Sequence, residues 1–306
     1  TIAGSVTGGC VEGAVFEEAR GVLKRGTPML LAYGVSNEQA WDVGLSCGGS
    51  VEIFVEALDS APWKAVTPLL EKTLVTRQAA ILFTILIGDS YGSKLLVTQE
   101  HETAGTLGSK KLDEKALSSI EGDWATRQPA QLMIEHGAEK ILVFADVILP
   151  PPRLIIVGAS HIAIPLVALA HTLEYYTIVL DARSAFATRE RFPHADEMIV
   201  DWPADALEKL NVDASTCVVC LSHDDKLDNP TLLYAIRSRA RYIGALGSRV
   251  THAKRLGALR KEGATAEELA RIHAPVGLKI GARQPAEIAL SIMAEIIATA
   301  HNAALG

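Results

Sequence analysis

The 306-residue sequence has few cysteines, no long apolar run and no excess of positive charge, and each of these absences excludes a class of protein. Four cysteines in a chain of this length do not make a disulfide scaffold, which favours a reduced, cytoplasmic protein. No apolar run reaches the ~18 residues that suggest a membrane-spanning helix. A net charge of −7 argues against a nucleic-acid or anionic-membrane partner, because both attract clustered Lys and Arg.

Three consecutive prolines, Pro150 to Pro152, divide the chain. They cannot continue a helix or a central strand and predict a stiff extended spacer. We therefore expect one domain over residues 1–149 and a second over residues 150–306. The chain begins on a glycine motif with no strand ahead of it, so we also expect residues before Thr1 in the natural protein, which could carry a targeting signal.

Short apolar strands alternate with helices throughout the second half. The strands are expected at residues 153–158, 176–181, 197–201, 215–222 and 241–247. The helices are expected at residues 161–173, 229–240, 249–263 and 285–300, with Pro165 in the first turn of its helix or kinking it. This alternation predicts an α/β fold, a Rossmann-like doubly wound parallel sheet with helices on both faces.

The first half is expected to be an α+β domain that contains an internal duplication. "TIAGSVTGGCVEGAVFEEA" aligns with "ETAGTLGSKKLDEKALSSI", which pairs Ser5 with Thr106 and Glu12 with Asp113. The alternative is that two glycine-bearing turns between a strand and a helix are alike by chance. The second copy has Lys111 where the first has a cysteine, so the turn itself does not require the thiol.

A turn typical of dinucleotide-binding proteins follows the first strand of the second half. It contains Gly158, Ser160 and His161, and Ser160 stands where the usual fingerprint has its second glycine. Asp181 ends the next strand, where an acid commonly binds a ribose, and Arg183 close by would favour a phosphate. These residues leave binding of NAD(P) or another nucleotide open.

A second cluster of polar residues, "SHDDKLD", follows the strand that ends near residue 222. His223 and the carboxylates, Asp228 among them, could transfer protons or hold a hard cation. The alternative is a solvated loop in which Asp228 or Asn229 caps the next helix.

Two further turns ahead of helices have the composition of anion sites. The first contains Gly247 and Arg249, and the second contains Gly277, Gly281 and Arg283. Backbone N–H groups at a helix start, together with an arginine, suit a phosphate.

The four cysteines fall into two kinds. Cys217 and Cys220 lie in an apolar strand and point to opposite faces, which predicts two core residues. Cys10 follows Gly8 and Gly9, and Cys47 precedes the similar pair Gly48 and Gly49. Glycines supply no packing partners, so these two thiols are expected to be accessible, as nucleophiles or soft-metal ligands. Sulfur handling, a disulfide switch and binding of a sulfur-containing ligand all remain open.

An ordered set of segments from Gly4 to Glu295 resembles the XdhC/CoxI family, whose members mature xanthine dehydrogenase and related molybdenum hydroxylases. The segments are "GSVTGGCVEG", "GLSCGGSVEIFVE", "PPPRLIIVGASHIA", "VLDARSAFATRERFPHAD", "LSHDDKLD", "YIGALGSR" and "RIHAPVGLKIGARQPAEIALSIMAEI". The last segment is the most specific.

The resemblance implies a chaperone that binds molybdenum cofactor, protects it while a cysteine desulfurase sulfurates it, and inserts it into the target hydroxylase. Such a chaperone is expected to have no catalytic turnover of its own. Cys10 and Cys47 would meet the metal or its transferable sulfur. The expected cofactor-binding residues are Cys10, Cys47, Gly8, Gly9, Gly48, Gly49, Gly158, Ser160, His161, Asp181, Arg183, His223, Asp228, Gly247 and Arg249.

Three alternatives remain beside this expectation. An NAD(P)-dependent oxidoreductase would use His223 as its proton donor, and a cysteine-persulfide sulfurtransferase would use Cys10 or Cys47. A redox sensor would keep its cysteines in the core. A homodimer is compatible with the small, glycine-rich first domain, but the sequence does not demonstrate one.

Overall fold

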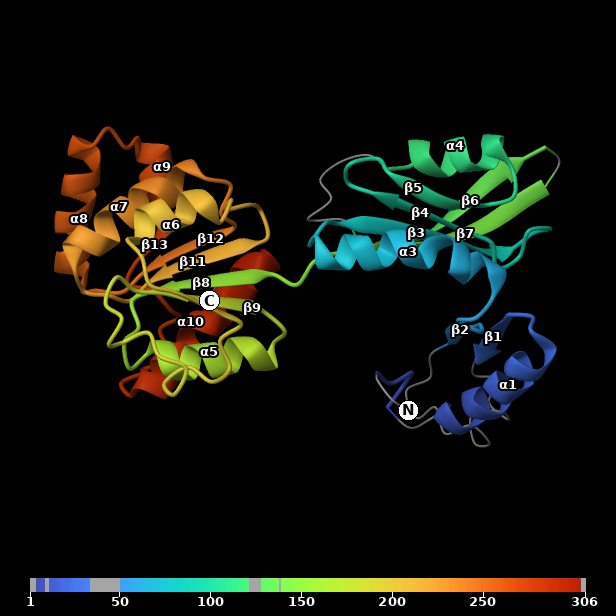
Figure 1. Cartoon of the computed structure of the whole chain (residues 1–306), viewed down its shortest axis with the longest axis horizontal. Coiled ribbons are helices and arrows are strands. Elements are labelled where there is room, and N and C mark those ends of the chain that lie inside the picture. Colours follow the sequence, from blue (N-terminus) through green and yellow to red (C-terminus); the bar gives the residue numbers. More distant parts are fainter. Residues whose placement is uncertain (1–3, 9–10, 34–49, 121–127, 138, 304–306) are drawn as a thin grey trace. The chain divides into compact units, whose positions relative to one another are not determined.

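The computed structural model describes residues 4–8, 11–33, 50–120, 128–137 and 139–303. The chain forms two compact units, Thr1–Pro150 and Pro151–Gly306, which we call the N-terminal and C-terminal units. Each unit contains its own sheets and core (Figure 1). Among the described helices, none is long and apolar enough to cross a membrane.

The larger sheet of the N-terminal unit is antiparallel, with the strand order β5-β4-β3-β7-β6. Its strands are β3 (Ala80–Ile87), β4 (Lys94–Thr98), β5 (Thr103–Thr106), β6 (Ala130–His136) and β7 (Glu139–Ile148). Helices α3 (Ala61–Val75) and α4 (Lys110–Ser118) cover its two faces (Figure 1). Alternate residues of β3 fill the two cores, so that Ile81 and Phe83 face the side of α4 while Ala80 and Leu82 face α3.

A smaller sheet pairs β1 (Met29–Tyr33) with β2 (Val51–Val55) in antiparallel register, after helix α1 (Glu12–Arg25). This order of a helix and two antiparallel strands is repeated by α4, β6 and β7. The turns before the two helices also match, since Ser5 Oγ donates to Glu12 at 2.8 Å and Thr106 Oγ1 donates to Asp113 at 2.8 Å. The shared geometry supports the internal duplication.

A buried ion pair joins the end of β2 to the larger sheet. The Lys94 side chain is 1% exposed, and its ammonium lies 2.7 Å from a Glu56 carboxylate oxygen and 3.0 Å from Thr84 Oγ1. The ammonium also lies over the rings of Trp63 and Phe54, at 4.6 and 5.7 Å from their centroids. Burial lowers the pKa of Lys94, and its bond to Glu56 opposes this shift. Glu56 therefore compensates a charge that water does not reach.

The C-terminal unit contains a parallel sheet with the strand order β10-β9-β8-β11-β12-β13. Its strands are β8 (Arg153–Val157), β9 (Tyr176–Leu180), β10 (Glu197–Ile199), β11 (Thr216–Cys220), β12 (Tyr242–Ala245) and β13 (Ile272–His273). Its helices are α5 (Ala163–Thr172), α6 (Pro203–Lys209), α7 (Asp225–Arg237), α8 (Arg249–Lys261), α9 (Ala266–Ala270) and α10 (Pro285–Ala300). The strand order reverses between β8 and β11, as in a doubly wound Rossmann fold, which confirms the predicted fold class.

A buried apolar layer lies on each face of this sheet. Helices α5 and α10 cover one face, and α6, α7, α8 and α9 cover the other (Figure 1). Cys217 packs in the first layer and Cys220 in the second, at 3% and 0% exposure. Burial raises the pKa of the Cys217 thiol to about 12 and that of the Cys220 thiol well above its ordinary value. The prediction of two core cysteines on opposite faces is confirmed.

We expect Glu56→Ala to destabilise the chain by about 3–5 kcal/mol, because it leaves the Lys94 ammonium buried without its carboxylate. Urea unfolding of the full chain measures the change. Glu102→Ala is the matched control, since Glu102 pairs with Lys72 on the surface, where side chains are 43% and 53% exposed. The control should cost at most about 1 kcal/mol. Equal costs for the two variants would contradict the role assigned to Glu56.

Candidate functional site

The carboxyl ends of the parallel strands form the edge at which open α/β sheets bind ligands. Gly158 follows β8 with φ +99°, and a Cβ there would lie 2.6 Å from both Cα and N of Ser222, which follows β11. The backbones of the two turns are therefore in contact at the point where the strand order reverses. Only glycine fits this close approach.

Asp181, just after β9, is fully buried and bound by the chain itself. Its carboxylate accepts hydrogen bonds from the Ala159 backbone N–H at 2.8 Å and from the Arg183 guanidinium at 2.9 and 2.8 Å. Burial by itself raises the pKa of this carboxyl, but these bonds outweigh it and hold the pKa of Asp181 below its ordinary value. The arginine also lies 4.4 Å from the centroid of the Phe186 ring. The acid expected to bind a ribose is thus closed off by Arg183.

Ser160 and His161 occupy the turn between β8 and α5. The Ser160 N–H donates to Gly158 O at 2.9 Å, so this amide also bonds within the turn. Ser160 Oγ is buried and has no hydrogen-bond partner within the described ranges, whereas His161 is exposed. In a usual dinucleotide-binding turn the backbone N–H groups are available to a phosphate. Here the N–H groups of Ala159 and Ser160 already donate to Asp181 and to Gly158 O.

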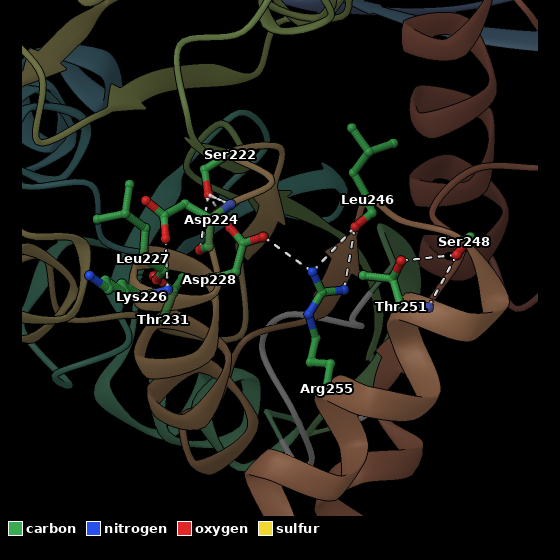
Figure 2. Close-up of polar contacts among 10 residues, drawn as sticks. All are labelled: Ser222, Asp224, Lys226, Leu227, Asp228, Thr231, Leu246, Ser248, Thr251 and Arg255. Carbon is green, nitrogen blue, oxygen red and sulfur yellow. Dashed lines mark hydrogen bonds and ion pairs between the residues drawn. The ribbon is translucent and has the colours of Figure 1, made fainter.

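A buried ion pair joins α7 to α8 and, through Ser222 and Leu246, connects the turns after β11 and β12 (Figure 2). Arg255 lies 3.2 Å from Asp228, and both side chains are 1% exposed. Ser222 Oγ donates to the other carboxylate oxygen of Asp228, and the Arg255 guanidinium donates to the Leu246 carbonyl at 3.3 Å. Burial is the largest influence on the Asp228 carboxyl and raises its pKa, although Ser222 and Arg255 oppose it. Asp228 therefore holds two turns together.

The residue that caps α7 is Asp224, and not Asp228 or Asn229 as in the alternative interpretation of this segment. Asp224 accepts from the Lys226 N–H at 2.9 Å, and the helix starts at Asp225. The helix expected at residues 229–240 was placed too late, since α7 starts at Asp225 and contains Pro230 in its interior. His223, just before the cap, is exposed and has φ +58°.

The turn after β12 leads into a pocket of about 940 Å³. Gly247 has φ +146°, Ser248 caps α8, and Arg249 is the first residue of that helix. Arg249 lines the pocket, as do residues of the loop after β13 and of α10. The lining residues are Leu246, Arg249, Ala274, Pro275, Val276, Gly277, Leu278, Lys279, Gly281, Ala282, Ile288, Ser291 and Glu295. We call this the β12–α10 pocket.

Glu295 supplies a carboxylate to the wall of the β12–α10 pocket. It is 8% exposed and accepts hydrogen bonds from Tyr242 Oη and, at 2.8 Å, from the Gly277 N–H, both on Oε2. His273 Nδ1 lies 3.6 Å from Oε1, and its ring stacks on Tyr242 at 4.6 Å between centroids. Burial tends to raise the pKa of Glu295, but its contacts with His273, Tyr242 and Gly277 prevail and lower it. The carboxylate therefore stays ionised at neutral pH.

Cys10 and Cys47, together with Gly9, Gly48 and Gly49, lie outside the described residues. Gly8 is described, with φ +82° and an exposed position next to the Glu12 carboxylate, which accepts its N–H at 2.8 Å. Within the described ranges, no group of three His, Cys, Asp or Glu side chains could hold a metal ion.

Sequence reasoning placed Gly158, Asp181, Asp228 and Arg249 in separate segments that follow strands of the second half, and in the structure each follows a strand of the parallel sheet. It missed the Glu295 cluster and Arg255. One signal could have indicated Glu295, because it is an isolated acid within the apolar run "SIMAEIIATA". Arg255 carries no such signal among the other basic residues of its helix.

The fold and this edge define a protein with a Rossmann domain after an α+β unit, and comparison with known proteins names the family. A family model described as the XdhC Rossmann domain matches residues 154–296, and one described as the XdhC and CoxI family matches residues 1–34. Together they match more than half of the chain, which belongs to the XdhC and CoxI family.

Relatives match along nearly the whole chain. A probable xanthine dehydrogenase subunit of Bacillus subtilis (strain 168) is 29% identical over 304 residues, covering 99% of this chain and 86% of that protein. The molybdenum cofactor insertion chaperone PaoD of Escherichia coli (strain K12) is 29% identical over 293 residues, 96% of this chain and 73% of that protein. A crystal structure of a xanthine dehydrogenase from Bacillus halodurans is similar with a TM-score of 0.78 and 27% identity, covering 98% of this chain and 83% of that chain.

We expect Gly158→Ala to destabilise the chain, because the new Cβ would overlap the backbone of Ser222 and because φ +99° strains any side chain. The strain alone costs about 1–3 kcal/mol, and the overlap adds to it. Gly263→Ala is the control: it has φ +85° but no atom nearer than 3.8 Å to the added Cβ. Urea unfolding should give a larger loss for Gly158→Ala, and equal losses would argue against the close approach of the two turns.

Arg255→Ala should destabilise the chain by about 3–5 kcal/mol, because Asp228 would remain buried without its cation. Arg260→Ala, on the exposed side of the same helix, should change stability by no more than about 0.5 kcal/mol. Adding Asp228→Leu to an Arg255→Met variant should recover part of the loss, since no buried charge remains. Thermal unfolding of the wild type and the four variants measures these changes. A double variant that is no more stable than Arg255→Met alone would contradict the stabilising role of the ion pair.

Proposed function

We propose that this protein is a molybdenum cofactor chaperone. It binds the cofactor, protects it while it is sulfurated, and inserts it into a molybdenum hydroxylase of the xanthine dehydrogenase type. The observation that carries the proposal is the similarity to a molybdenum cofactor insertion chaperone, over 96% of this chain and 73% of that protein. The cofactor is cargo here, so the chain needs groups that hold and release it rather than groups that turn over a substrate.

The carboxyl edge of the Rossmann sheet favours this proposal over an NAD(P)-dependent oxidoreductase. The acid that would bind a ribose, Asp181, is fully buried and already accepts bonds from Arg183 and the Ala159 N–H. A ribose hydroxyl could reach this carboxylate only after Arg183 had left it. An open pocket lies farther along the same edge, where Arg249 and Lys279 could meet an anionic ligand.

The thiols Cys10 and Cys47 belong to the proposal through their sequence context. Glycine pairs flank both, and thiolates are ligands that soft metals prefer. We assign them the molybdenum or its transferable sulfur, and we assign the Rossmann domain the organic part of the cofactor. A cysteine desulfurase, the target hydroxylase and a cytoplasmic location complete the proposal, and a homodimer is compatible with it.

The test is anaerobic retention of molybdenum cofactor by the full chain. We expect stoichiometric molybdenum and pterin on the wild type and a loss of at least tenfold in retained molybdenum on Cys10→Ala. Lys111→Ala is the matched control, because Lys111 takes the place of Cys10 in the second copy of the turn. It should retain the cofactor fully.

Three other outcomes would contradict the proposal. Absence of retention by the wild type overturns the chaperone function. Tight nicotinamide binding with no dependence on Cys10 indicates the oxidoreductase, and a persulfide on Cys10 or Cys47 without cofactor indicates the sulfurtransferase. Mass spectrometry of the intact protein and titration with NAD(P)H separate these two.

A further inference from the structure

We propose that the β12–α10 pocket binds a 2-amino-4-oxopyrimidine ring, the ring that pterins and guanine share, and that Glu295 recognises its amino group. Through the pterin of the cofactor, the inference rests on the proposed function and deepens it. It names the place on this chain where the organic end of the cargo is held.

The size and lining of the pocket suit such a ligand. Its volume is about 940 Å³, within the range of small-molecule and cofactor sites. Leu246, Val276 and Ile288 provide apolar walls, against which a flat ring can pack. Arg249 and Lys279 bring two cations to the same pocket. The ligand is therefore expected to join an aromatic ring to an anionic group such as a phosphate.

Glu295 requires a ligand with a hydrogen-bond donor, which a simple phosphate ester lacks. Its carboxylate is a hydrogen-bond acceptor, so the group facing it must donate. Oε2 already accepts from Tyr242 and Gly277, whereas Oε1 has a single contact, with His273 Nδ1 at 3.6 Å, which is an ion pair when the imidazole is charged and is longer than a hydrogen bond. Oε1 thus keeps capacity for a ligand N–H. An amino group on a ring satisfies both the carboxylate and the apolar walls.

The surroundings of Glu295 hold it ready for a ligand. Gly277 has φ +95°, and a Cβ there would overlap Ser291 Oγ, so the loop after β13 lies directly against α10. This close contact aims the Gly277 N–H at Glu295. Tyr242 reaches the same carboxylate from β12, and His273 stacks on Tyr242. A carboxylate held by hydrogen bonds from Tyr242 and Gly277 loses little freedom when a ligand binds.

Two pairs of probes isolate the amino group. Lumazine is pterin with an oxo group in place of the 2-amino group, and IMP is GMP without its 2-amino group. We expect the full-length wild type to bind pterin at least tenfold more tightly than lumazine, or GMP at least tenfold more tightly than IMP. Fluorescence and calorimetric titration measure these ratios. The pair with the larger ratio tells whether a pterin or a guanine is the preferred source of the ring.

Glu295→Gln should reduce the preference to less than threefold, because a neutral amide is a weaker acceptor. Glu262→Gln, an exposed glutamate of the same unit, is the control and should keep the full preference. Lys279→Ala should weaken the binding of GMP more than that of guanosine, because only GMP carries a phosphate. It should leave the preference for the amino group unchanged. Because Glu295 also bonds Tyr242 and Gly277, its substitution could destabilise the protein. Ala282→Phe is therefore a second variant, in which the larger side chain fills the pocket from the loop after β13. It should weaken every probe at least tenfold.

The outcomes separate this inference from the chaperone proposal. A wild type with no preference in either pair, or an Ala282→Phe variant with undiminished binding, overturns the pocket assignment even when molybdenum cofactor is retained. An unchanged preference in a folded Glu295→Gln variant overturns the role of Glu295. A wild type that prefers pterin but retains no molybdenum cofactor supports the pocket and overturns the proposed function.

Discussion

The buried pair between Asp228 and Arg255 is the interaction on which the carboxyl edge of the Rossmann sheet depends. Two charges that are 1% exposed stay in the protein because each neutralises the other and because Ser222 and the Leu246 carbonyl add hydrogen bonds to them. The pair therefore fixes the turn after β11 relative to the turn after β12. The second of these turns leads directly to Arg249 at the β12–α10 pocket.

Arg183 occupies the carboxylate that a ribose would need at the carboxyl edge of the Rossmann sheet. In a dinucleotide-binding domain the acid after the second strand faces the ligand. Here the guanidinium and the Ala159 N–H take up that acid, Asp181, and close the place of the ribose. The open volume lies instead between the turn after β12, the loop after β13 and α10. The β12–α10 pocket of this Rossmann sheet thus lies away from the point where the strand order reverses, and its lining combines cations, apolar walls and one carboxylate.

Local patterns made much of the fold predictable. The strands around Ile155, Ile178 and Val218 are continuous apolar runs, because a parallel sheet covered on both faces buries every side chain. Cys217 and Cys220 could be assigned to opposite cores from their spacing alone. The start of α7 could not be placed as well, because Asp224, Asp225 and Asp228 are all suitable caps and only the packed structure selects Asp224.

The sequence by itself determined the alternation of strands and helices in the second half, the glycine turns and the family, since these depend on local periodicity and on motifs. Only the tertiary structure decided which charges meet. Arg183 turns back on Asp181, Arg255 reaches Asp228 from another helix, and Glu295 meets Tyr242 across 53 residues. Pairings of this kind depend on distances between elements that are remote in the chain. For that reason Asp181, a ligand residue by its motif, became an internal brace, and Glu295, an acid in an apolar helix, became part of a pocket wall.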